Sequence, residues 1–273
     1  KIKSVMSHKG VSILARLEIN YLSETIGMHQ SLTVILPDDK SYVQPNVQPK
    51  LLPSLLLLHG LSSDHSAYTR FTSIERYANA HQLAVIMPNA DHSFYTNMVY
   101  GHSYYDYILE VWDYVHQILP LSKAREDNFV AGHSMGGYGT IKFALTAGER
   151  FAKAAPLSAA VDVKTLAHYT FPDFKPKAIA GEVTKVEGTP FDPYYLVDEA
   201  VKKQKQIPEF LMMCGTEDFL YQSNVDFVHY LQQKGISCDF KDGTGRHDYA
   251  YWDKAIQTVI ETFMKDHHTR ETK

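Results

Sequence analysis

The chain has 273 residues, a length that suits one large α/β domain. It is 44% apolar and 21% charged, as in ordinary soluble globular proteins. The net charge is −4 and no run of Lys and Arg interrupts the sequence, which excludes nucleic acid and anionic membrane surfaces as partners. The densest apolar stretch, residues 51–58, is too short to span a bilayer.

Cys214 and Cys238 are the only cysteines, too few for a disulfide framework or a metal site. We expect two free thiols and a cytoplasmic location, with one bridge between them as the alternative. The chain begins with Lys1 rather than Met, so the sequence leaves open whether a leader peptide was removed. The sequence does not decide between a monomer and a homo-oligomer.

Strands and helices alternate along most of the chain. The first two strands come without a helix between them, which indicates an antiparallel edge on an otherwise mostly parallel sheet with helices on both faces. β-branched and aliphatic runs mark the strands, and apolar residues three and four apart mark the helices. In chain order the sequence predicts strands at 11–19, 31–36, 55–58 and 83–87, a helix at 108–119, a strand at 128–131, a helix at 139–147, strands at 152–157 and 210–214, a helix at 225–231, a strand at 236–240 and a helix at 252–263.

Residues 159–206 interrupt this alternation. The segment is rich in aromatic residues and proline and has no clear period. We expect a cap-like insertion over the sheet within a single domain that spans residues 1–273.

Gly132-His133-Ser134-Met135-Gly136 fits G-x-S-x-G, the nucleophile elbow of α/β-hydrolases. That turn holds a serine between a strand and a helix in strained backbone geometry, where side chains two residues away would collide. The predicted strand before it and the small-residue helix after it supply this context. Ser134 is therefore the candidate nucleophile, and the amide of Met135 is a candidate oxyanion donor. An incidental serine in a glycine-rich turn is the alternative.

The acid and the base should follow on loops after late strands. Asp218 comes shortly after the strand at 210–214, with Glu217 as its rival and a helix N-cap as its alternative role. His247 lies between the strand at 236–240 and the last helix, and is the one histidine after Asp218 in a suitable loop. The order predicts Ser134 as nucleophile, His247 as general base and Asp218 as its orienting acid.

A second oxyanion donor is expected in the loop after the strand at 55–58, where Gly60 allows close approach and the amide of Leu61 can donate. His59, Gly60 and His133, together with Tyr100 in the loop after 83–87, are candidate substrate-binding residues. For Tyr100 the alternative is ordinary aromatic packing. His59 and His65 could suggest a metal pair, but no carboxylate or cysteine set completes it, so we expect neither metal nor cofactor.

Four blocks together resemble the putative esterase (esterase D-like) family, and most of all its bacterial tributyrin esterases. The likeness runs from about residue 32 to 263. It implies a carboxylesterase that prefers short acyl chains, with relatives acting on acetylated or feruloylated sugars, and supports the same triad and oxyanion donors. S-formylglutathione hydrolases of this group carry a different block at His59-Gly60. The blocks are 57–61, 132–139, 214–218 and 247–253.

The sequence therefore predicts a serine carboxylesterase that hydrolyses a small-molecule ester through an acyl-enzyme. Thioester hydrolysis or acyl transfer on the same fold is the alternative. A hydrolase-fold binding protein without catalysis is a third hypothesis, which the presence of all three triad residues disfavours. We expect the rate to fall as the pH drops through the range in which histidine becomes protonated, because only a neutral imidazole acts as a base.

Overall fold

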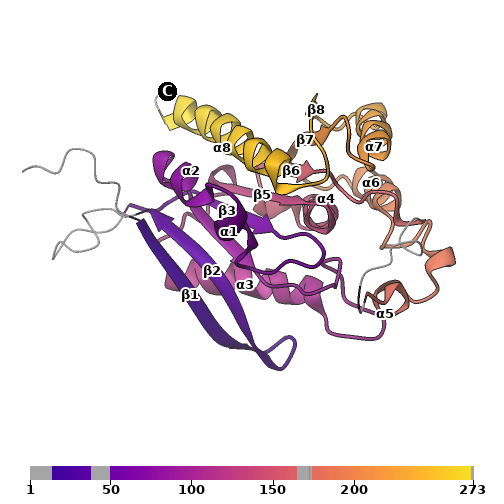
Figure 1. The fold of residues 1–273 in the computed structure, drawn as a ribbon, viewed down its shortest axis with the longest axis horizontal. Coiled ribbons are helices and arrows are strands. Elements are labelled where there is room, and N and C mark those ends of the chain that lie inside the picture. The colour runs from indigo at the N-terminus through magenta and orange to yellow at the C-terminus, as the bar shows by residue number, and fades with distance from the viewer. Residues whose placement is uncertain (1–13, 38–49, 165–171, 173, 272–273) are drawn as a thin grey trace, which may run out of the picture.

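The computed structural model describes residues 14–37, 50–164, 172 and 174–271 (Figure 1). These residues contain one eight-stranded sheet in the order β1-β2-β4-β3-β5-β6-β7-β8. The strands are β1 (Leu14–Ser23), β2 (Met28–Pro37), β3 (Ser54–Leu58), β4 (Ala84–Pro88), β5 (Asn128–His133), β6 (Lys153–Leu157), β7 (Glu209–Gly215) and β8 (Cys238–Gly243). The helices are α1 (Ala67–Phe71), α2 (Ile74–Ala80), α3 (Tyr104–Ile118), α4 (Met135–Thr146), α5 (Pro176–Ala180), α6 (Pro193–Lys202), α7 (Tyr221–Gln233) and α8 (Tyr249–Glu271).

The sheet has the predicted antiparallel edge. β1 and β2 pair antiparallel from Leu14 opposite Pro37 to Ser23 opposite Met28, and β2 pairs antiparallel with β4. From β4 to β8 every pairing is parallel. The α/β fold with a mostly parallel sheet is therefore confirmed. The first three residues of the strand expected at 11–19 lie outside the described part of the chain.

Helices cover both faces of the sheet. Alternate residues of β3 point to opposite sides, so Leu56 and Leu58 belong to the core cluster that includes residues of α3, α4 and α7, while Leu55 and Leu57 belong to the cluster that includes residues of α2 and α8. Figure 1 shows α2 and α8 together on one side and α3 on the other. A strand buried on both faces needs apolar residues at every position, which explains the unbroken run of leucines.

The segment 159–206 contains more regular structure than expected. Helix α6 begins at an N-cap, because the side chain of Asp192 accepts a hydrogen bond from Tyr194 N at 2.9 Å, and Pro193 occupies the first turn. Leu196 and Val197 are buried in the core. The Asp-Pro pair was the available signal for this helix. Residues 165–171 and 173 of the expected insertion lie outside the described residues.

Cys214 and Cys238 are buried free thiols on the neighbouring strands β7 and β8. The register pairs Cys238 with Phe210 and Cys214 with Asp242, so the two cysteines are offset by four residues along the strands. Such an offset exceeds the Cα separation that a disulfide can bridge. In the described part of the chain, no helix has the length and apolar character needed to cross a membrane.

Candidate active site

Ser134 lies at a sharp turn between β5 and α4, with φ 55° and ψ −115°. Such a conformation in a non-glycine residue costs about 1–3 kcal/mol and persists only where the surroundings hold it. Three bonds hold it here: Ser134 N donates to Leu157 O at 2.9 Å, and Ser134 O accepts from Tyr138 N at 3.0 Å and from Ala160 N at 3.2 Å. The turn projects the serine beyond the carboxyl end of β5.

The two glycines of the motif are required by close backbone packing. A Cβ on Gly136 would lie 2.2 Å from Leu58 O, and one on Gly132 would lie 2.6 Å from Gly136 O. Neither obstacle can move without displacing the sheet or the helix. The G-x-S-x-G spacing thus follows from the tight crossing of α4 over β3 and β5.

The structure brings Ser134, His247 and Asp218 together from three different loops. His247 Nε2 lies 2.9 Å from Ser134 Oγ, and His247 Nδ1 lies 2.8 Å from Asp218 Oδ2 and 3.1 Å from Oδ1. A carboxylate can only accept, so Nδ1 carries the proton and donates it to Asp218. Nε2 of the neutral ring is then free to accept the proton of Ser134 Oγ.

Asp218 is buried at the end of β7, and its rival Glu217 is not. Burial opposes the charged form of Asp218, but hydrogen bonds from His247, from Leu220 N at 2.9 Å and from Ser158 outweigh it, and its pKa lies below the usual value. Glu217 instead accepts a hydrogen bond from Arg246 Nε at 3.1 Å, in an exposed ion pair. The acid that meets His247 is therefore Asp218.

Of the two expected oxyanion donors, Met135 directly follows the serine, and Leu61 lies in a loop that approaches the residue before it. Met135 is the first residue of α4, and the first N–H groups of a helix have no partner within it. Leu61 lies in a turn closed by the bond from Ser63 N to Gly60 O at 3.3 Å. A Cβ on Gly60 would lie 2.6 Å from His133 Nε2, so only glycine lets this turn approach the elbow so closely.

His59 and His133 lie beneath these loops, each at most 2% exposed. His59 Nε2 accepts from Ala90 N at 2.9 Å, so its Nδ1 donates to Gly60 O at 2.8 Å. His133 Nδ1 is 2.9 Å from Tyr68 Oη. Burial lowers the pKa of His59 to about 4 and that of His133 well below its usual value, so both rings are neutral.

Tyr100 is placed quite differently from the two buried histidines. Its side chain is 74% exposed, and its backbone N donates to Ala178 O of α5 at 2.9 Å. The loop that carries it is therefore joined to the described part of the 159–206 segment. In the described residues, no group of three His, Cys, Asp or Glu side chains is arranged to hold a metal ion.

Three neighbours of the triad were not identified from the sequence. The ring of Phe219 lies 4.6 Å from that of His247, and Trp252 meets the same imidazole edge-on at 4.9 Å. Trp252 Nε1 donates to Ser158 Oγ at 3.1 Å. Phe219 directly follows Asp218, so adjacency was a signal for it. Nothing in the sequence marked Ser158, which reaches Asp218 only through the fold.

The known proteins that resemble this chain include esterases and serine hydrolases. A family model described as "Putative esterase" matches residues 23–262. An acetyl esterase from Caldicellulosiruptor saccharolyticus is 27% identical over 92% of this chain and 99% of its own. The substrate-bound structure of FphF, a fluorophosphonate-binding serine hydrolase of Staphylococcus aureus, is 61% identical, with a TM-score of 0.90 over 92% of this chain and 98% of its own.

A second Staphylococcus aureus structure, described as the S-formylglutathione hydrolase FrmB, is also 61% identical, with a TM-score of 0.88 over 93% of this chain and 100% of its own. A ferulic acid esterase at 20% identity shares the fold, with a TM-score of 0.78. The protein is thus a serine hydrolase with the α/β-hydrolase fold, and it acts on carboxylic esters. Within that class, the chain belongs to the putative esterase family.

Proposed function

We propose that this enzyme hydrolyses short-chain acyl esters through an acyl-enzyme on Ser134, with His247 as general base and Asp218 as the acid that orients it. The observation that carries the proposal is the position of one imidazole, 2.9 Å from Ser134 Oγ and 2.8 Å from Asp218 Oδ2. Hydrogen-bond distances of this kind are what proton transfer from a nucleophile requires.

In the first half of the reaction, Ser134 Oγ attacks the acyl carbon while His247 Nε2 takes its proton. The carbonyl oxygen becomes an oxyanion, which the amides of Leu61 and Met135 would stabilise with the dipole of α4 behind them. His247 then gives the proton to the leaving oxygen, and the carbon–oxygen bond breaks. In the second half a water molecule repeats the sequence, and the acid leaves with Oγ restored.

A small acyl group is supported by the acetyl esterase among the relatives. We assign His59 and His133 to positioning the loops rather than to binding substrate, because both rings are buried and already hydrogen-bonded. We also infer a cytoplasmic location, since two free thiols suit a reducing compartment.

Thioester hydrolysis is the second candidate. A structure 61% identical to this chain is described as an S-formylglutathione hydrolase. This likeness keeps thioester hydrolysis as a candidate beside the difference at His59-Gly60. The same triad would cleave a thioester, with the thiolate rather than an alkoxide as the leaving group.

We further propose that residues 1–273 form one domain, with the described part of 159–206 acting as a cap beside the active site. Tyr138, one turn after Ser134 on α4, donates its hydroxyl to Phe191 O at 2.8 Å. Val99 N donates to Ile179 O at 3.1 Å. These bonds join the segment to the elbow helix and to the loop after β4.

Hydrolysis of p-nitrophenyl acetate, butyrate and octanoate, set beside S-formylglutathione, tests the proposal. We expect Ser134→Ala to lose activity by about 10³-fold or more while its circular dichroism stays unchanged. Asp218→Ala should lose far more activity than its matched neighbour Glu217→Ala. Normal turnover by Ser134→Ala would overturn the mechanism, and a preference for octanoate would overturn the short-chain assignment.

A further inference from the structure

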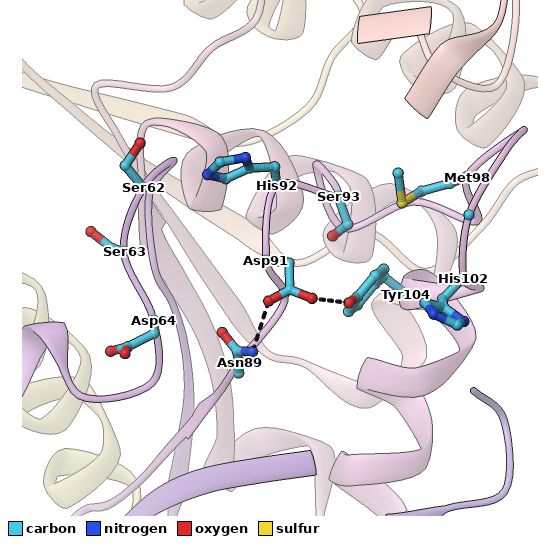
Figure 2. A pocket seen from close by; sticks show the side chains of 11 residues that line it. Ser62, Ser63, Asp64, Asn89, Asp91, His92, Ser93, Met98, His102 and Tyr104 are labelled. Carbon is cyan, nitrogen blue, oxygen red and sulfur yellow. Dashed lines mark hydrogen bonds between the residues drawn. The ribbon is translucent and has the colours of Figure 1, made fainter. Parts of the chain in front are cut away.

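A pocket of about 660 Å³ lies among the loops that follow β3 and β4 (Figure 2). Its walls come from three segments, 62–64 after β3, 89–93 after β4 and 98–104 at the start of α3. Figure 2 shows the 62–64 loop on one side, Met98 to Tyr104 on the other, and Asp91 between them. Most of the lining side chains are polar, and no role has been given to them so far.

The pocket is joined to the reaction centre on two sides. Ser62 directly follows Leu61, the expected oxyanion donor, and Ser63 Oγ lies 3.3 Å from the hydroxyl of Tyr249, two residues beyond His247. The 89–93 segment is held to the oxyanion loop by the bond from Ala90 N to His59 Nε2 at 2.9 Å. The pocket therefore borders the loop that is expected to hold the oxyanion.

The part of the substrate that suits this pocket is the leaving group. His247 must hand its proton to the leaving oxygen, so the leaving group lies on the side of His247, to which Ser63 is linked through Tyr249. An alkyl acyl chain placed here would strip water from carboxylates. A polar alcohol that later departs into solvent avoids this cost.

Two carboxylates give the pocket its charge. Asp64 is exposed; desolvation opposes its charge, but the N–H and hydroxyl of Ser66 donate to Oδ1 at 2.8 and 2.6 Å and hold the pKa of Asp64 below the usual value. Asp91 accepts from Asn89 Nδ2 at 3.0 Å and from the hydroxyl of Tyr104. The described residues that line the pocket include no Lys or Arg.

We propose that this pocket is the leaving-group subsite, and that it takes an alcohol or thiol bearing a positive charge, such as an amino alcohol or a quaternary ammonium alcohol. The inference rests on the proposed function. Each carboxylate keeps unused lone pairs on its oxygens, with which a cation can interact. Glutathione, a thiol with two carboxylates and one ammonium group, has a net negative charge. The two carboxylates of the pocket would repel it.

Three acetyl esters that differ in the charge of the alcohol test this subsite. The probes are acetylcholine, its neutral carbon isostere 3,3-dimethylbutyl acetate, and 3-acetoxypropanoate. We expect kcat/KM of the wild type to favour the cation over the neutral isostere by about 2- to 30-fold, the range for two partly exposed charge pairs. The anion should be the poorest of the three, and added salt should reduce the preference.

Asp64→Asn and Asp91→Asn should each lower the cation-to-neutral ratio by about 1.4- to 5-fold. Asp239→Asn is the matched control, because it removes the same charge from an exposed position on β8 and should leave the ratio unchanged. A wild-type ratio at or below one, or a ratio that neither pocket variant lowers, would overturn the subsite. If Ser134→Ala still hydrolyses p-nitrophenyl acetate, the mechanism fails instead, so the two failures are distinguishable.

Discussion

Phe219 holds an aromatic ring against the imidazole of the candidate triad while 69% of the residue is exposed. A ring in that position gains little from burial. Its face can, however, stabilise the positive charge that His247 acquires when it takes the proton from Ser134. The contact therefore contributes to catalysis more than to the stability of the fold.

Phe219→Ala should lower kcat/KM for p-nitrophenyl acetate by about 2- to 5-fold, the value of an exposed cation–π contact. Phe71→Ala is the control, since Phe71 is a similarly exposed ring that contacts Tyr249 rather than His247. An unchanged rate would assign Phe219 no part in catalysis.

Single residues were predictable where their spacing is fixed by chemistry. The order Ser134, Asp218, His247 follows from the fold class, and the structure brings these three side chains together. The neutral state of His59 and His133 was not predictable, because it depends on burial that only the folded chain creates. Neither was the pairing of Asp91 with Tyr104, thirteen residues away.

At the scale of elements, the carboxylate of Glu110 on helix α3 accepts hydrogen bonds from the β1–β2 hairpin. Glu110 accepts from Ser23 Oγ at 2.9 Å, from Glu24 N at 3.2 Å and from Thr25 N at 2.9 Å. Burial works against its charge, but these donors outweigh burial and hold the pKa of Glu110 below its usual value.

Glu110→Gln should lower the free energy of unfolding by about 1 kcal/mol at neutral pH, because an amide is a weaker acceptor. The folded-state pKa is depressed, so the stabilisation is present above the ordinary pKa of a glutamate and is lost as the pH falls through the lower, folded value. Urea unfolding at pH 7 and at pH 3 measures the difference, with Glu261→Gln on the exposed side of α8 as control. Equal losses at both pH values would contradict this role.

Most elements with a strong periodic pattern were predicted within a few residues, although α8 runs eight residues beyond the predicted end at 263, and the shortest helices were not predicted. The helix expected at 108–119 is α3, Tyr104–Ile118. Helix α1 has only five residues, too few for an apolar period to show. Its existence depends on tertiary contacts such as the one between Tyr68 and His133.

At the scale of the whole molecule, a lysine lies in the interior. Lys142 on α4 is 7% exposed and donates to Thr96 Oγ1 at 2.7 Å. Three aromatic rings surround its ammonium, and the described residues place no carboxylate in ion-pair contact with it. Burial lowers the pKa of Lys142 to about 8. The fold therefore carries an energetic penalty at neutral pH.

Lys142→Met should raise the free energy of unfolding at pH 7 by about 1–3 kcal/mol, because the buried charge is removed. The unfolded chain binds the proton more tightly than the folded one, so wild-type stability should rise between about pH 8 and 10.5, and the advantage of the variant should shrink. Urea unfolding at pH 7 and 10 checks this, with exposed Lys202→Met as control. A variant less stable at pH 7 would show that the ammonium is net stabilising.

Ser134 and His247 are 113 residues apart in the chain. At a ribosomal rate of about 5–20 residues per second, the serine is synthesised about 6–23 s before its base. During that interval no imidazole is in place to activate Ser134, whatever the state of the elbow. The growing polypeptide is therefore a latent hydrolase, and cellular esters meet an active one only after β8 and the loop that follows it have left the ribosome.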